Sequence, residues 1–187
     1  MGLEPGGDGG DFFQAFPASR SPSGQPVALR NVVGVLRGSN AAWAGQSVVL
    51  CAHYDHLGFG WPDVHKGDEG RLHPGADDNA SGVAVMLELA KALASGEKPQ
   101  RTIAFVAFTG EESGLLGSKH YADHPAFPLE KTIGVINLDT VGRLGAQPVT
   151  FLGTGTATEW PHIARGASFV TGIASRTELG GSGDAGD

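Results

Sequence analysis

The chain has 187 residues, which is enough for one domain with a sizeable core and leaves little room for a second. Hydrophobic residues make up 40% and charged residues 18%, a balance that is typical of globular proteins and excludes a disordered chain. The net charge of −7 argues against a nucleic-acid-binding surface, and no apolar run is long enough to predict a membrane-spanning helix.

The cysteine content and the start of the chain limit the chemistry and the compartment. The single cysteine, Cys51, rules out an internal disulfide and any cysteine-cluster zinc site. Residues 1–11 are rich in glycine and acidic residues and lack the basic and apolar regions of a signal peptide. Such a start is expected of a cytoplasmic protein, or of a chain from which a leader has been removed.

Residues 1–30 are expected to be irregular, because Gly, Pro and Ser dominate them. From residue 31 onward, short apolar runs alternate with helical patterns. The runs are rich in β-branched residues and are bounded by turn residues, which predicts strands. The expected strands are Asn31–Leu36, Ser47–Ala52, Thr102–Phe108, Thr132–Leu138 and Val149–Leu152.

Apolar residues at helical spacing predict three helices: Ser81–Ala94, Glu112–Ala122 and Glu159–Val170. Strands that alternate with helices indicate an α/β fold, with a largely parallel, doubly wound sheet between helices. The strands are continuous apolar runs, so we expect both faces of the sheet to be covered. Residues 31–187 would then form a single catalytic domain.

Polar residues collect where the expected strands end and where the first helix begins. They are His53, Asp55, Asp77, Asp78, Glu111, Glu112 and Asp139. Ligands of such sheets bind outside the carboxyl ends of the strands, so these side chains should meet at one edge. Imidazole and carboxylate without thiolate suit zinc, manganese or cobalt. Because crowded carboxylates repel one another, we expect cations here, and paired metals that share a carboxylate recur in aminopeptidases.

The spacing within two pairs indicates different tasks. His53 and Asp55 are two residues apart on an extended segment, so their side chains point to the same side. One can bind metal while the other accepts the remaining imidazole proton. Glu111 and Glu112 are neighbours that point in different directions, so one can bind metal while the other faces the attacking water. His56 is expected near the pocket, either as a loop residue or as a residue that contacts a ligand without binding metal itself.

Each of these residues also has a plainer interpretation. Asp77 or Asp78 could cap the first helix, and we expect Asp78 to do so. The two glutamates could open a solvated helix, where the helix dipole favours them. Asp139 could be a turn residue. These polar residues stand in four separate segments, three at strand ends and one at a helix start. Their joint occurrence at such positions favours the metal site.

Four motifs, in this order and spacing, resemble peptidase family M28. They are AHYDHLG (52–58), GADDNASG (75–82), GEESGLLGS (110–118) and NLDTVG (137–142). The resemblance covers residues 31–153 and implies a mixed, mostly parallel sheet flanked by helices. It also implies a secreted, periplasmic or lumenal protein that removes residues from peptides with a free N-terminus, using two zinc ions.

The resemblance assigns roles to six residues. His53 and Asp139 would bind one zinc ion, Asp77 would bridge both ions, and Glu112 would bind the second. Glu111 would be the general base, and Asp55 would orient His53.

The sequence departs from the family at its end. The family places a further histidine ligand after another core strand, whereas residues 180–187 could only begin the preceding loop. The second metal site is therefore expected to be incomplete, with as few as one zinc ion held firmly. The chain could be a fragment, or another chain could supply the rest. Uncovered sheet surface would favour self-association.

Two other functions stay open at this point. One is a single-zinc acyltransferase that resembles glutaminyl cyclase, which would need an acyl-transfer pocket. The other is a catalytically incomplete chain that acts only as a binding or structural module.

Overall fold

The computed structural model describes residues 2–18, 25–60 and 64–180. The chain divides into two units, Met1–Gly142 and Arg143–Asp187, where a single domain over residues 31–187 was expected. The division follows the hydrogen bonding, because the strands after Gly142 pair with each other in a sheet of their own. Residues 181–187, the expected start of a further loop, lie outside the described part.

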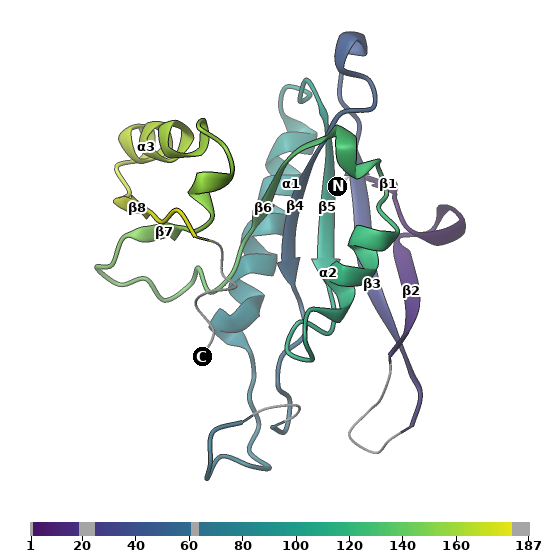
Figure 1. Ribbon diagram of the computed structural model, residues 1–187, viewed down its shortest axis with the longest axis vertical. Helices are drawn as coiled ribbons and strands as arrows, with labels where there is room; N and C mark the ends of the chain where they lie inside the picture. Colours follow the sequence, from purple (N-terminus) through teal and green to yellow (C-terminus); the bar gives the residue numbers. More distant parts are fainter. Residues whose placement is uncertain (1, 19–24, 61–63, 181–187) are drawn as a thin grey trace. The chain divides into compact units, whose positions relative to one another are not determined.

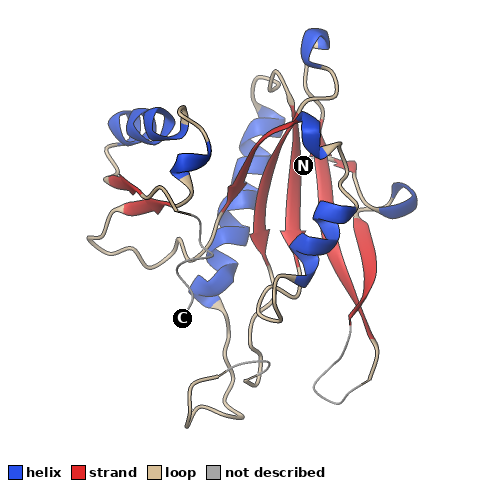
Figure 2. Ribbon diagram, in the orientation of Figure 1, coloured by secondary structure: helices blue, strands red, loops and turns tan. Residues whose placement is uncertain are grey.

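The larger unit is built on a six-stranded mixed sheet (Figures 1 and 2). Its main strands lie in the order β3 (Val27–Leu36), β5 (Thr102–Phe108), β4 (Ser47–His53) and β6 (Thr132–Asn137). β4 runs parallel to β5 and β6, whereas β3 runs antiparallel to β5. The parallel pairing brings the ends of β4, β5 and β6 to the same edge.

Residues 1–30 contain strands, which corrects the expectation that they are irregular. β1 (Glu4–Pro5) and β2 (Phe13–Ala18) both pair antiparallel with β3. The residues of β2 that face inward are Gln14 and Phe16, which are 4% and 7% exposed. A polar residue at one of these positions conceals the alternation that normally reveals a strand.

Two helices cover opposite faces of this sheet (Figure 1). α1 (Gly82–Ser95) contributes Met86 and Ala90 to one cluster of buried side chains, and α2 (Leu116–Asp123) contributes Tyr121 to the other. Successive residues of a strand face opposite sides, so the continuous apolar runs supply both clusters. This arrangement holds the loops at the strand ends on a packed base.

The smaller unit contains β7 (Val149–Phe151), α3 (Trp160–Thr171) and β8 (Ser175–Thr177). The two strands pair in parallel, and α3 lies between them in the chain. β8 was not expected, because its sequence is short and polar and carries no strand pattern. In the part of the chain that the structure describes, no helix has the length and apolar character needed to cross a membrane.

Candidate metal centre

His53 is the last residue of β4 and is almost fully buried. Its Nδ1 lies 3.1 Å from the backbone oxygen of Asp55 and 3.7 Å from the Asp55 carboxylate. Donation from Nδ1 to the carbonyl fixes the tautomer and leaves the lone pair of Nε2 for another partner. Asp55 therefore orients the ring mainly through its backbone, and its carboxylate is the more distant partner.

The surroundings of His53 favour a positive charge. Burial acts to lower the pKa of the ring, but the nearby carboxylates of Asp139, Asp55 and Glu111 outweigh burial and raise the pKa to about 11. The same carboxylates would favour a metal cation at Nε2 in place of the proton.

Asp78 lies in an irregular turn, Ala76–Ser81, immediately before α1. Its Oδ1 is 3.0 Å from Nε2 of His53, and its Oδ2 is 3.8 Å from Nδ1 of His56. Oδ1 is buried and has no hydrogen-bond partner among the described residues. A buried carboxylate oxygen needs a compensating positive charge, which a protonated His53 or a bound cation would supply, so this position fits an oxygen that binds a cation.

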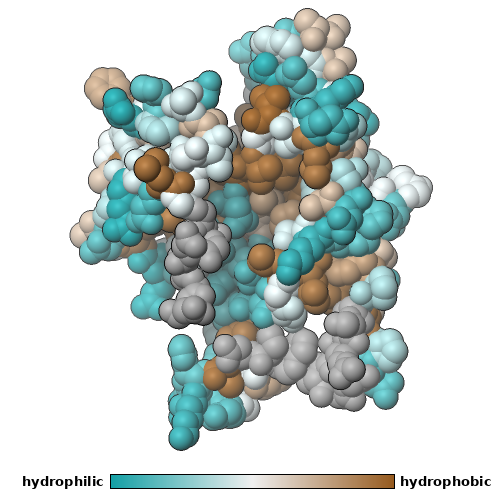
Figure 3. Space-filling model, in the orientation of Figure 1, coloured by the Kyte–Doolittle hydropathy of each residue, from teal (hydrophilic) through white to brown (hydrophobic). Residues whose placement is uncertain are grey.

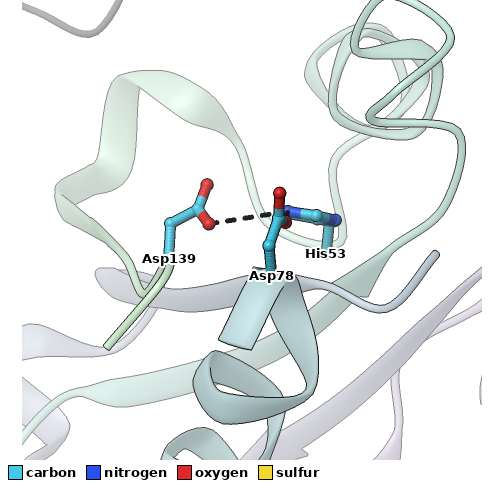
Figure 4. A group of neighbouring side chains, drawn as sticks. All are labelled: His53, Asp78 and Asp139. Carbon is cyan, nitrogen blue, oxygen red and sulfur yellow. Dashed lines mark ion pairs between the residues drawn. The ribbon is translucent and has the colours of Figure 1, made fainter. Parts of the chain in front are cut away.

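Asp139 completes a first group of potential ligands. It follows β6, and its Oδ1 lies 3.6 Å from Nε2 of His53. One ligand atom each from His53, Asp78 and Asp139 lie within 4.8 Å of one another. Figure 4 shows the two carboxylates turned toward the imidazole. Three segments that are distant in the sequence thus meet at one point, as the strand-end argument predicts.

The structure places Asp77 and Asp78 differently from their expected positions. Asp77 belongs to none of the potential metal-binding groups in the described residues, and its Oδ1 instead accepts a hydrogen bond from the backbone of Gly142 at 2.8 Å. Asp78 occupies the position expected for Asp77. The expected capping role falls to Asn79, whose Oδ1 accepts from the backbone of Gly82 at 3.1 Å. The dihedral angles of Asp78 and Asn79 are not helical, so helical spacing does not predict where their side chains point.

Glu111 and Glu112 lie in the turn between β5 and α2. The helix begins at Leu116, four residues later than expected, and Gly110 has the positive φ of 66° that opens the turn. Glu111 and Glu112 form a second group of potential ligands with His53. Both glutamates therefore face the cluster from a turn, and neither is part of a solvated helix.

Glu111 has the electrostatic setting of a base. Burial raises its pKa above the usual value, and the negative charges of Glu112, Asp139 and Asp55 act in the same direction, while His53 opposes them. Its backbone nitrogen donates to the carboxylate of Asp55 at 3.2 Å. A carboxylate whose pKa is raised is a stronger base than an exposed glutamate, and here it lies beside potential metal ligands.

His56 belongs to a third group, which the sequence analysis did not anticipate. Its Nδ1 lies 2.6 Å from Oε1 of Glu112, and one ligand atom each from His56, Asp78 and Glu112 lie within 4.8 Å of one another. The available signal was its position three residues after His53 in the same strand-end loop. That signal is weak, because a histidine in a loop is usually solvated.

Comparison with known sequences gives a consistent result. The model of peptidase family M28 matches residues 31–180. A probable zinc metalloprotease of Pyrenophora teres f. teres is 38% identical over 138 residues, which cover 74% of this chain and 28% of that protein. Aminopeptidase YwaD of Bacillus subtilis is 39% identical over 114 residues, which cover 60% and 22%. The chain thus spans less than a third of the length of these relatives.

Solved structures confirm the expected α/β fold. BSAP, a zinc aminopeptidase from Bacillus subtilis, has a TM-score of 0.64 and 32% identity, covering 84% of this chain and 38% of that one. A glutaminyl cyclase of Porphyromonas gingivalis has a TM-score of 0.67 and 22% identity, covering 90% and 62%. At this lower identity the likeness shows the fold alone.

Proposed function

The chain belongs to peptidase family M28, and from this premise we propose that it acts as a zinc-dependent aminopeptidase on peptides with a free N-terminus. The carboxylate of Asp78 carries the proposal. One of its oxygens lies 3.0 Å from Nε2 of His53, and the other lies 3.8 Å from Nδ1 of His56. The carboxylate of Asp78 could therefore be shared by two groups of potential ligands.

We infer that two zinc ions bind here. His53, Asp78 and Asp139 would hold one ion, and Asp78 and Glu112 would contribute to the other. Imidazole nitrogen and carboxylate oxygen are ordinary zinc ligands. The buried Oδ1 of Asp78 lies 3.0 Å from Nε2 of His53, and this supports the assignment, because a cation bound by both atoms would neutralise the carboxylate there.

When bound, zinc supplies Lewis-acid polarisation of the scissile carbonyl and eases ionisation of the attacking water. Glu111 takes the proton from that water and passes it to the leaving amine. Burial raises the pKa of Glu111, which makes it a stronger proton acceptor than an exposed glutamate. Asp55 holds this base in place through the backbone nitrogen of Glu111, and holds His53 through its own carbonyl.

The charge of the cluster supports the choice of substrate. The carboxylates of Asp78, Glu111, Glu112 and Asp139 come together at one strand edge. With zinc bound, a substrate's free α-amino group can reach the carboxylate oxygens and the ions that they hold, whereas an acetylated nitrogen offers neither a charge nor an available lone pair. The proposal therefore specifies hydrolysis at the first peptide bond and no cleavage of blocked peptides.

The first prediction tests the base. Replacing Glu111 with Gln should lower the rate at which the zinc-loaded protein releases N-terminal amino acids by about 10²–10⁴-fold, because the proton acceptor is lost. The measurement is amino-acid release from free and acetylated peptides, with zinc content determined by elemental analysis. Glu97→Gln is the matched control, since Glu97 is exposed and lies outside the potential metal-binding groups.

Three results would contradict the proposal. The wild-type protein could bind no zinc, or it could release amino acids equally fast when Glu111 is replaced. It could also convert a glutamine-terminated peptide into its cyclic form without releasing any residue, which would indicate an acyl transfer.

A further inference from the structure

We propose that His56 is itself a ligand of the second cation, which it binds through Nδ1 together with Oδ2 of Asp78 and Oε1 of Glu112. The inference rests on the proposed function, since it adds a nitrogen ligand to the second ion. It assigns a metal-binding role to a residue whose sequence context indicates only a loop.

The three ligand atoms lie within 4.8 Å of one another, close enough to be drawn onto one zinc ion by small side-chain movements. Ligand atoms about 2.1 Å from a tetrahedral zinc ion lie about 3.4 Å from one another. Nδ1 of His56 lies 2.6 Å from Glu112 and 3.8 Å from Asp78, which are values on either side of that separation. In the first group, Nε2 of His53 lies 3.0 Å from Asp78 and 3.6 Å from Asp139. The two groups therefore match each other in spacing and share one carboxylate.

The backbone holds His56 close to the turn that carries Asp78. Gly75 has a φ of +66°, and a side-chain carbon added there would lie 2.8 Å from Cβ of His56 and 3.0 Å from its Cγ. Only a glycine allows this close approach. The side chain of His56 is 21% exposed and that of Glu112 is 18% exposed, so both are largely withdrawn from solvent. A largely buried, preformed pair of ligands is what a metal site requires.

The competing interpretation is that His56 only donates a hydrogen bond to Glu112 and orients it. An orienting histidine would never be bonded to the metal, and its loss typically costs about 10–100-fold in metal affinity. The loss of a ligand should cost more and should remove a metal–nitrogen bond. A measurement that detects this bond therefore separates the two roles.

The experiment uses cadmium-113 as the probe in the full chain with ¹⁵N-labelled histidine. Scalar coupling between ¹¹³Cd and ¹⁵N appears only where the two nuclei are bonded. We expect two coupled imidazoles, one through Nε2 and one through Nδ1. His56→Ala should abolish the Nδ1 coupling, keep the Nε2 coupling, and weaken binding of the second equivalent more than about 100-fold. His162→Ala is the control, since His162 is exposed in the smaller unit.

The outcomes are separable from those of the aminopeptidase proposal. Coupling through Nε2 alone in the wild type, or Nδ1 coupling that survives in His56→Ala, would overturn the inference and leave the peptidase assay to decide the function. His56→Gln keeps a polar side chain in case the alanine variant does not fold, and it should lose the same coupling. Failure of the wild type to bind either metal would overturn both proposals.

Discussion

At the scale of single residues, burial changes the reactivity of the Cys51 thiol. It lies in β4 and is 2% exposed. Burial raises the pKa of the thiol to about 12. A thiol that stays protonated is inert, because the thiolate is the nucleophile.

We therefore expect the folded protein to resist alkylation by iodoacetamide at about pH 8.5, with a rate roughly a thousandfold below that of the unfolded chain. The thiol of the unfolded chain has its usual pKa of about 8.5, so about half of it is ionised at that pH. Mass spectrometry of samples with and without urea measures both rates. Equal rates in the two samples would show that the thiol is accessible and ionised in the folded state.

The sequence reveals which residue types form the site but cannot separate neighbours. His53, Glu111, Glu112 and Asp139 come together as their positions after strands predict. The choice between Asp77 and Asp78 depends on dihedral angles in an irregular turn, which neither helical nor strand periodicity describes. The same limit applies to His56, whose neighbours come from the turns before α1 and before α2.

At the scale of elements, Asn79 joins the start of α1 to the segment after β6. Its Oδ1 accepts hydrogen bonds from the backbone of Gly82 and Thr140, and its Nδ2 donates to the oxygen of Leu138 at 2.9 Å. The side chain is 1% exposed. Because Asp78 precedes Asn79 and Asp139 follows Leu138, this side chain sets the distance between two potential ligands.

Asn79→Ala should lower the affinity for zinc by about 10–100-fold without removing a ligand. It should also destabilise the protein by about 2–3 kcal/mol, because the buried backbone groups lose their partner. Competition with a chromophoric chelator gives the affinity, and urea denaturation gives the free energy of unfolding. Asn40→Ala is the control, since Asn40 is a half-buried cap of a short turn far from the cluster in sequence. An unchanged affinity would mean that the turns hold their positions without Asn79.

The elements that were predicted well have cores of continuous apolar residues. β5 has the expected bounds, and β4 extends one residue beyond them. β2 was missed because buried polar groups satisfy each other there. Gln14 donates to the oxygen of His124 and accepts from Asn31, whose Nδ2 also donates to the oxygen of Gly117. This network is formed with residues of α2 and β3 that are distant in the sequence, so the local sequence of β2 does not predict the strand.

At the scale of the whole molecule, the outer strand of the larger sheet is apolar and exposed. β6 ends the sheet in the described part of the chain. Ile133 and Val135 are 53% and 56% exposed. Figure 3 shows hydrophobic side chains gathered on the visible face over the region of β4, β5 and β6. An exposed apolar edge is a template for pairing with another chain.

We therefore expect the protein to self-associate, and Val135→Lys to raise the concentration at which this occurs by about tenfold or more, because a charge opposes edge pairing. Sedimentation velocity over a series of concentrations measures the effect. Ile163→Lys in α3 is the control, since Ile163 is 54% exposed but belongs to the smaller unit. A wild-type protein that stays monomeric throughout would refute the expectation.

The shared carboxylate of Asp78 also bears on how the fold is maintained. The two groups of potential ligands that contain Asp78 come from the end of β4 and the loop after it, from the turns before α1 and α2, and from the segment after β6. Ions held there would act as a cross-link between segments that are far apart along the chain, and would be absent once the chain unfolds. The unfolding equilibrium would then be coupled to the zinc supply, with each tenfold rise in free zinc above the dissociation constant adding about 1.4 kcal/mol for each bound ion.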